Sequence, residues 1–326
     1  MASDRKILLS GVKPTGRPHI GNYFGAMRQF AELQEKYEAY VFIADFHALT
    51  TLQNGGELAR NSLDIALDYL AIGLDPKKAV LFKQSEVPEV CELAWIFNCI
   101  TTVPYLERAH AYKDAVAKGK EANVGLFDYP MLMASDILIQ DADVVPVGQD
   151  QKQHVEYARD TAEKFNRVFG GDVFKLPEPL ILENVKTVPG TDGQKMSKSY
   201  GNIIPLFAED EEIKELVMGI VTDSGSDIPK NVYAIHELFR EKTDLDRLYD
   251  EKRGKYQALK ETLAEDIISF VAPMRARRAD LVKDRNAVLE ILKRGGEKAR
   301  ARASEKMKRV KKLTGLFTYY REEDGR

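Results

Sequence analysis

Short apolar runs alternate with helix-like segments through the first two-thirds of the chain, and this alternation constrains the fold more than any other feature. Runs that read as buried strands span residues 6–9, 40–44, 79–82 and 143–147. Segments with helical periodicity lie between or after these runs. They start at residue 19, span about 57–73, 90–100 and 104–113, and start again at residue 150. Strands that alternate with helices in this way are typical of a parallel sheet covered by helices. We therefore predict an α/β fold with a doubly wound parallel sheet.

Strand patterns disappear beyond residue 205. Helical segments follow near residues 208–221, 231–241, 244–270, 275–281 and 284–313. We therefore divide the chain into a doubly wound domain, residues 1–205, and an all-helical domain, residues 206–326. Within the second, residues 296–312 have a net charge of +6, although the whole chain carries −3. Lys306, Lys308 and Arg309 are candidate RNA contacts, but a solvated helix face explains the basic stretch equally well.

Composition narrows the function classes. The chain has 326 residues, 44% of them hydrophobic, and contains neither a signal-peptide pattern nor an apolar run long enough to cross a bilayer. Its two cysteines, Cys91 and Cys99, lie eight residues apart, which predicts buried thiols in a reducing compartment. We expect a cytoplasmic protein with no membrane partner, and the small net charge argues against general affinity for nucleic acid, including DNA.

One segment carries two lysines three residues apart, in the sequence Lys195-Met196-Ser197-Lys198-Ser199. Glycines surround it at positions 190, 193 and 201. Ammonium groups, hydroxyls and closely approachable backbone N–H groups together suit a polyphosphate ligand. A solvated basic turn is the alternative for any such segment taken alone.

A second phosphate-binding pattern lies near the N-terminus. The run at 6–9 ends in a turn-rich loop over 10–18, and a helix-like pattern starts at His19. Backbone donors at such a strand–loop–helix junction meet phosphates. Lys13, Pro14 and Thr15 are therefore candidates for the phosphate path, and His19 is a candidate donor, although a helix-start histidine exposed to water is its simplest alternative.

These motifs carry a family resemblance. Residues Pro18-His19-Ile20-Gly21-Asn22 resemble the HIGH signature, and Lys195–Ser199 the KMSKS signature, of class I aminoacyl-tRNA synthetases, about 175 residues apart. Asn22 in the fourth signature position, together with residues 129–138 and 145–154, resembles the tryptophanyl branch. The resemblance runs from about residue 5 to about 315, and the chain is identified as a member of the bacterial-type tryptophanyl-tRNA synthetases.

The resemblance implies a Rossmann-like catalytic domain, a helical tRNA-binding domain and a homodimer. It implies that L-tryptophan reacts with ATP, carried with Mg²⁺, to give tryptophanyl-adenylate and pyrophosphate, and that tryptophan then moves to tRNA(Trp). We expect no protein-bound metal or prosthetic group, because no dedicated acidic cluster is evident. The implied catalytic residues are His19, Lys195 and Lys198. The implied ATP contacts are Lys13, Pro14, Thr15, Gly21, Asn22, Gly148, Gln149, Asp150, Val188, Lys195, Met196, Ser197, Lys198 and Ser199.

Asp136 is the implied specificity residue. The indole N–H can only donate a hydrogen bond, so one acceptor in an aromatic-sized slot matches tryptophan. The alternative is that Asp136 faces solvent on an amphipathic helix. Secondary pocket candidates are Tyr129, Met133, His47 and Gln151.

Three positions depart from the commoner pattern: Leu9, Phe46 and Ala115, the last where a mobile-loop lysine is usual. Lys113, Lys118 or Lys120 could replace that cation. Other readings are a tyrosyl-tRNA synthetase, a small-molecule nucleotidylyltransferase, and a non-catalytic RNA-binding module. The segment around Asp136 argues against the tyrosyl enzyme. The basic helical third argues against the nucleotidylyltransferase, and the intact signatures argue against the non-catalytic module.

Overall fold

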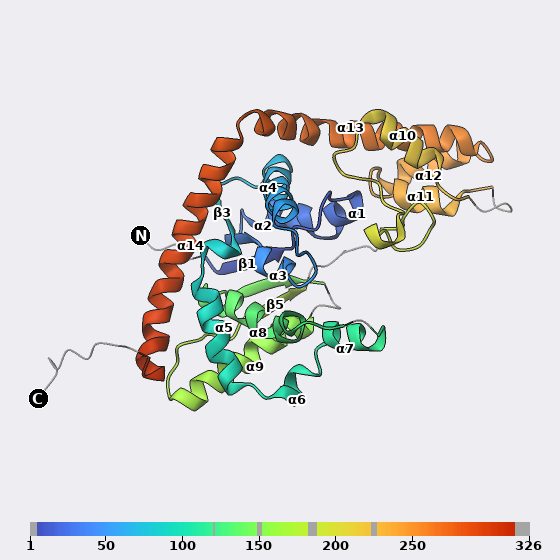
Figure 1. The fold of residues 1–326 in the computed structure, drawn as a ribbon. Helices are drawn as coiled ribbons and strands as arrows, with labels where there is room; N and C mark the ends of the chain where they lie inside the picture. Colours follow the sequence, from blue (N-terminus) through green and yellow to red (C-terminus); the bar gives the residue numbers. More distant parts are fainter. Residues whose placement is uncertain (1–4, 120, 149–151, 182–187, 223–226, 317–326) are drawn as a thin grey trace, which may run out of the picture.

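The fold is built on a five-stranded sheet in which every pair of neighbouring strands is parallel (Figure 1). The computed structural model describes residues 5–119, 121–148, 152–181, 188–222 and 227–316. The strands are β1 (Ile7–Val12), β2 (Glu38–Ile43), β3 (Ala79–Lys83), β4 (Val144–Val147) and β5 (Glu178–Ile181), in the order β3-β2-β1-β4-β5. The order reverses direction at β1, so the predicted doubly wound, Rossmann-like fold is confirmed.

Four of these strands were predicted, and β5 was missed. β5 is only four residues long, contains Pro179, and is exposed or half-buried along its length. Its apolar run, Leu180-Ile181-Leu182, is short and directly follows Pro177 and Pro179, and proline argues against a strand inside a sheet.

Helices cover both faces of the sheet, and the strand residues alternate between two hydrophobic cores. Leu8 and Val41 belong to one core, whereas Leu9 and Phe42 belong to the other, as the two-residue period of a strand requires. The helices of this part are α1 (Ile20–Asn22), a π-helical turn (Tyr23–Met27), α2 (Arg28–Leu33), α3 (Asp45–Ala48), α4 (Gly55–Ala71), α5 (Glu89–Ile100), α6 (Val103–Leu106), α7 (His110–Ala117), α8 (Val124–Ile139) and α9 (Lys152–Phe169). Short 3₁₀ turns lie at Gln84–Glu86 and Lys198–Tyr200.

The C-terminal third is helical in its described ranges, as predicted, but its helices are divided differently. They are α10 (Asp210–Met218), α11 (Lys230–His236), α12 (Lys242–Glu251), α13 (Tyr256–Lys283) and α14 (Arg285–Thr314). The predicted helix at 244–270 is interrupted by a turn in which Gly254 has a φ of +73°, a conformation that suits glycine. Conversely, α13 continues through Pro273.

The last helix returns to the sheet. Figure 1 shows α13 along the top of the view, above α4, and α14 running alongside β3. A methyl group built on Gly295 would lie 2.0 Å from the carbonyl oxygen of Leu81 in β3, so the glycine allows helix and strand backbones to touch. Ala299, Ala303 and Met307 are buried in the core that contains Leu9. The division of the chain near residue 205 stays a prediction, and helices beyond it share hydrophobic cores with the residues before it.

The expectation of buried cysteines is wrong. Cys91 and Cys99 are both free and exposed, because they lie with Trp95 at four-residue spacing on the outer face of α5. No helix in the described ranges is long and apolar enough to span a bilayer.

Candidate active site

Two cavities adjoin at the carboxyl end of β1. The Asp136 cavity, of about 290 Å³, is lined by Leu9, Ser10, Gly11, Lys13, Ala26, Phe30, Phe42, Ala44, His47, Tyr129, Met133, Asp136, Ile137, Val145, Pro146, Val147, Gly148, His154 and Val155. The Lys198 cavity, of about 300 Å³, is lined by Gly11, Val12, Lys13, Thr15, Gly16, Pro18, Asn22, Ala26, Met27, Phe30, Ile65, Tyr69 and Lys198. They share Gly11, Lys13, Ala26 and Phe30. Ligand sites of open α/β sheets lie at this end of the strands.

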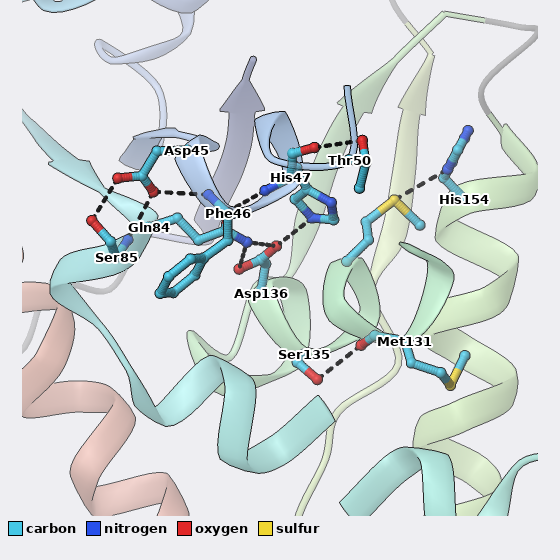
Figure 2. A network of polar contacts seen from close by, with 11 residues as sticks. Asp45, Phe46, His47, Thr50, Gln84, Ser85, Met131, Ser135, Asp136 and His154 are labelled. Atoms are coloured by element: carbon cyan, nitrogen blue, oxygen red, sulfur yellow. Dashed lines mark hydrogen bonds and ion pairs between the residues drawn. The ribbon is translucent and has the colours of Figure 1, made fainter. Parts of the chain in front are cut away.

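Asp136 on α8 is only 4% exposed and lies at the centre of a polar network (Figure 2). Its carboxylate accepts hydrogen bonds from Gln84 Nε2, at 2.9 and 2.8 Å to the two oxygens, and makes a 3.0 Å contact with His47 Nε2. Burial raises the pKa of Asp136, and the bonds from His47 and Gln84 oppose that rise. A carboxylate offers about four lone-pair positions, so it retains acceptor capacity toward the cavity. The alternative of a solvent-facing Asp136 is excluded.

His47 holds Asp136 and is itself held on three sides. Thr50 donates its hydroxyl to the His47 carbonyl at 2.8 Å, the His47 N–H donates to Gln84 Oε1 at 3.3 Å, and the Tyr129 ring lies 4.2 Å from the imidazole between centroids. His47 Nδ1 is buried and has no hydrogen-bond partner in the described part of the chain. An orphaned polar atom in a ligand cavity indicates a place where a ligand or water completes the bonding.

Gln84 was missed by the sequence reading. It follows β3 directly, as His47 follows β2, and polar residues after parallel strands meet at one edge of the sheet. That position was the available signal. The same turns are tied by Asp45, which accepts from the Ser85 N–H at 2.9 Å and the Ser85 hydroxyl at 2.5 Å.

His19 is buried and caps α1. Its Nδ1 accepts the Asn22 N–H at 3.2 Å, and Asn22 Oδ1 accepts the His19 N–H at 3.1 Å. Burial, aided by the charge of Lys198, lowers the pKa of His19 to about 4. The imidazole is therefore neutral at pH 7 with its proton on Nε2. This corrects the alternative of an exposed helix-start residue.

The two signature segments converge. Lys198 donates to the carbonyls of Thr15 and Gly16, at 2.9 and 3.0 Å, and lines the Lys198 cavity. A methyl group on Gly21 would lie 2.8 Å from His19 Nδ1, so glycine leaves room for the His19 ring, and the same methyl position lies at ordinary contact distance, 3.4 Å, from Met196 Cβ. Burial lowers the pKa of Lys198, and Asp68 opposes that effect.

The lysine segment is held by its own short contacts. The Val188 carbonyl accepts the Met196 N–H at 2.9 Å, and Asn202 Oδ1 accepts the Ser197 N–H at 2.8 Å. Lys195 and Ser199 are exposed, and neither lines one of the two cavities as the described residues define them.

Of the other predicted ATP contacts, the structure brings only some to the two cavities. Thr15 and Asn22 line the Lys198 cavity, and Gly148 lines the Asp136 cavity. Pro14 and Val188 are buried, and Val188 belongs to the same hydrophobic core as Met196. The remaining predicted contacts Gln149, Asp150 and Gln151, and the alternative cation Lys120, lie outside the described residues.

The three departures fall in different places. Leu9 lines the Asp136 cavity, whereas Phe46 lines a separate hollow with Trp95. Ala115 is buried on α7. Of the alternative cations, Lys118 is exposed and pairs with Asp114 at 2.7 Å.

The RNA assignment of Lys306 is wrong. Its side chain is 3% exposed and donates to Asp141 Oδ1 at 2.5 Å and to the Val173 carbonyl at 2.7 Å. It therefore anchors α14 to the chain at Asp141 and Val173. Lys308 and Arg309 are exposed, with contacts to Glu305 and to the Asp172 carbonyl.

The sheet order and the converging signature segments define the class as the class I aminoacyl-tRNA synthetases. The family of class I tRNA synthetases for tryptophan and tyrosine matches residues 1–279. The tryptophan–tRNA ligase of Fusobacterium nucleatum subsp. nucleatum is 49% identical, covering 94% of this chain and 97% of its own length. That of Rhodopirellula baltica is 46% identical, covering 95% and 99%. This chain belongs to the tryptophanyl-tRNA synthetases.

Solved structures agree. The tryptophanyl-tRNA synthetase from Campylobacter jejuni, crystallised with ADP and tryptophan, has a TM-score of 0.89 at 44% identity and covers 95% of this chain and 100% of its own. The enzyme from Mycoplasma pneumoniae has a TM-score of 0.81 at 30% identity, covering 95% and 98%. A tyrosyl-tRNA synthetase from Archaeoglobus fulgidus, at 22% identity and a TM-score of 0.63, shares the fold.

Proposed function

We propose that this chain is a tryptophan–tRNA ligase, which activates L-tryptophan with ATP and transfers it to the 3′ end of tRNA(Trp). One observation carries the proposal: Lys198 reaches the Thr15 and Gly16 carbonyls beside the buried His19, at a cavity adjoining the one that contains Asp136. The cation of one signature and the loop of the other thus meet beside a hydrogen-bond acceptor of the kind that indole needs.

Tryptophan occupies the Asp136 cavity in this proposal. Its indole N–H donates to Asp136, whose orientation is fixed by Gln84 and His47. Tyr129 and Met133 supply apolar contact beside the ring. An amino acid without this donor leaves the remaining acceptor position of Asp136 unused in a buried site, which costs about 1–3 kcal/mol and disfavours its activation.

The triphosphate occupies the Lys198 cavity. A tryptophan carboxylate oxygen attacks the α-phosphorus, the bond from that phosphorus to the bridging oxygen breaks, and its electron pair leaves with pyrophosphate. Lys198 supplies positive charge to the departing pyrophosphate from the cavity wall, and the exposed Lys195 of the same segment is the second cation of the proposal. His19, neutral at pH 7, donates its Nε2–H to a phosphate oxygen.

ATP enters as its Mg²⁺ complex, with the metal on the phosphate oxygens that a hard cation prefers. Within the described ranges, no three histidine, cysteine, aspartate or glutamate side chains gather in a way that could hold a metal. The metal ion supplies neutralisation of triphosphate charge, while the protein positions the nucleotide.

Residues 206–326 form the tRNA-binding domain in this proposal. Lys308 is exposed, and its one ion pair among the described residues is with Glu305 on its own helix. Such a surface pair contributes at most about 1 kcal/mol, so a phosphate can replace the glutamate. Arg309 gives one N–H to the Asp172 carbonyl and has further donors for RNA.

We also propose a cytoplasmic homodimer. Trp95 is 70% exposed and Leu49 47% exposed, and both line one surface hollow with Phe46 and Leu132. An apolar patch of this kind suits contact with a second copy of the chain. The cytoplasm is where ATP, tryptophan and tRNA occur together.

The deciding experiment is ATP–pyrophosphate exchange with each of the twenty amino acids, followed by charging of purified tRNA(Trp). We expect exchange with tryptophan and charging of this tRNA. Exchange with tyrosine alone would assign the tyrosyl activity instead. Absence of exchange, in a protein that binds RNA, would establish the binding-module alternative.

A further inference from the structure

The Lys13 ammonium is the one basic group, among the described residues, that lines both cavities. The Asp136 cavity otherwise contains the imidazoles of His47 and His154, and the Lys198 cavity contains only Lys198 besides. Lys13 follows β1, and the Thr15 N–H donates to its carbonyl at 2.9 Å in a tight turn. The buried Pro14 fixes the backbone between them. The Lys13 side chain therefore lies where the two cavities meet.

The neighbours of this ammonium leave it without a negative partner. Lys13 Nζ lies 3.4 Å from Thr50 Oγ1 and 5.8 Å from the centre of the Tyr129 ring. Thr50 gives its own proton to the His47 carbonyl, so its oxygen accepts from Lys13. No carboxylate of the described residues lies within 4.0 Å of the Lys13 ammonium. An ammonium has three donors, and two remain for a ligand.

A half-buried cation without a counter-ion is costly, and here burial lowers the pKa of Lys13. That cost is offset when an anion binds beside the ammonium. The junction of the two cavities is where the reaction places two anions together, since the amino-acid carboxylate must approach the α-phosphate. Their mutual repulsion opposes the approach unless a cation lies between them.

We propose that Lys13 is a catalytic residue whose ammonium bridges the tryptophan carboxylate and the α-phosphate. This inference rests on the proposed function. As the carboxylate oxygen bonds to phosphorus and the electron pair of the breaking bond leaves with pyrophosphate, Lys13 stabilises the charge that gathers on the α-phosphate oxygens. No proton moves in this step, and Lys13 stays protonated throughout.

Lys13 and Lys198 have different roles in this proposal. Lys198 lines only the Lys198 cavity, so it serves the leaving pyrophosphate, whereas Lys13 serves the reacting pair. Position 115, where a cation was expected, holds a buried alanine. Lys13 thus supplies positive charge from the first loop.

The test is Lys13→Met, which keeps the length of the side chain and removes its charge, with Lys13→Arg as the charge-preserving variant. Lys6→Met, at an exposed position directly before β1, is the matched control. Single-turnover adenylate formation should fall roughly 10²–10³-fold in Lys13→Met. It should be substantially restored in Lys13→Arg and unchanged in the control.

Equilibrium binding supplies a measurement that a merely structural role would not reproduce. Lys13→Met should weaken tryptophan roughly tenfold or more, the scale of one charged hydrogen bond. Tryptamine, which lacks the carboxylate, should bind as well as it does to the wild type. Equal losses for both ligands, or wild-type adenylate formation, would overturn the role of Lys13.

The wild-type protein and the Lys13 variants test different proposals. A wild-type protein without tryptophan-dependent exchange would sink the proposed function itself. A fully active Lys13→Met would sink only the inference about Lys13. If Lys13→Met does not fold, as judged by circular dichroism, the same ligand comparison on Lys13→Gln decides, with equal losses for the two ligands again contradicting the proposal.

Discussion

The neutral state of His19 makes a quantitative prediction about acid stability. Burial and Lys198 lower the pKa of His19 from 6.5 to about 4. The unfolded chain therefore binds more protons than the folded chain between these values, and the free energy of unfolding falls as the pH falls through this window. Complete protonation costs about 3 kcal/mol, and the loss between pH 7 and pH 5 is about 2 kcal/mol. Protonation also places a hydrogen on Nδ1, where the Asn22 N–H now donates.

His19→Asn isolates this contribution, because asparagine is a good N-cap residue and does not titrate. Urea unfolding followed by circular dichroism at pH 7 and pH 5 should show a loss of stability smaller by about 2 kcal/mol in His19→Asn than in wild type. His110→Asn, at an exposed position on α7, is the control and should behave as wild type. Identical losses in His19→Asn and wild type would refute the reasoning.

Three further predictions concern the reaction. Lys198→Ala should slow single-turnover adenylate formation roughly 10²–10³-fold while tryptophan binding, measured by calorimetry, stays near wild type; an unchanged rate would contradict the role of this lysine. Asp136→Asn should weaken tryptophan binding roughly tenfold to a hundredfold, and equal weakening of an analogue with a methylated indole nitrogen would argue against a bond to Asp136. Replacing Lys308 and Arg309 together with alanine should raise the KM for tRNA in charging assays roughly tenfold and leave pyrophosphate exchange intact, whereas losses in both assays would indicate a damaged fold.

The sequence predicted the sheet well because its first four strands carry strong apolar runs. β1, β2, β3 and β4 begin and end within two to three residues of the predicted runs. β5 was missed because its short apolar run directly follows two prolines, which argue against a strand. The helices were predicted, but the points at which they are interrupted were not. Gly254 lies in a turn between two helices, whereas Gly295 packs inside α14, and only the three-dimensional structure distinguishes them.

The site was predicted through its motifs and not through its supporting contacts. Lys198 and His19 could be assigned because their segments resemble known signatures. Gln84, which orients Asp136, and the burial of Lys306 depend on contacts between residues 52 and 165 positions apart. Local periodicity contains no information about such contacts, so a basic run looks the same whether its lysines face RNA or an internal carboxylate.

The packing of α14 against β3 has a consequence for biosynthesis. β3 is the outermost strand on its side of the sheet, and the helix that covers it is synthesised about 200 residues after it. Until then the nascent chain displays a bare strand whose backbone groups invite pairing with another chain. Ribosome-stalled chains that lack α14 should therefore depend on chaperones to stay dispersed.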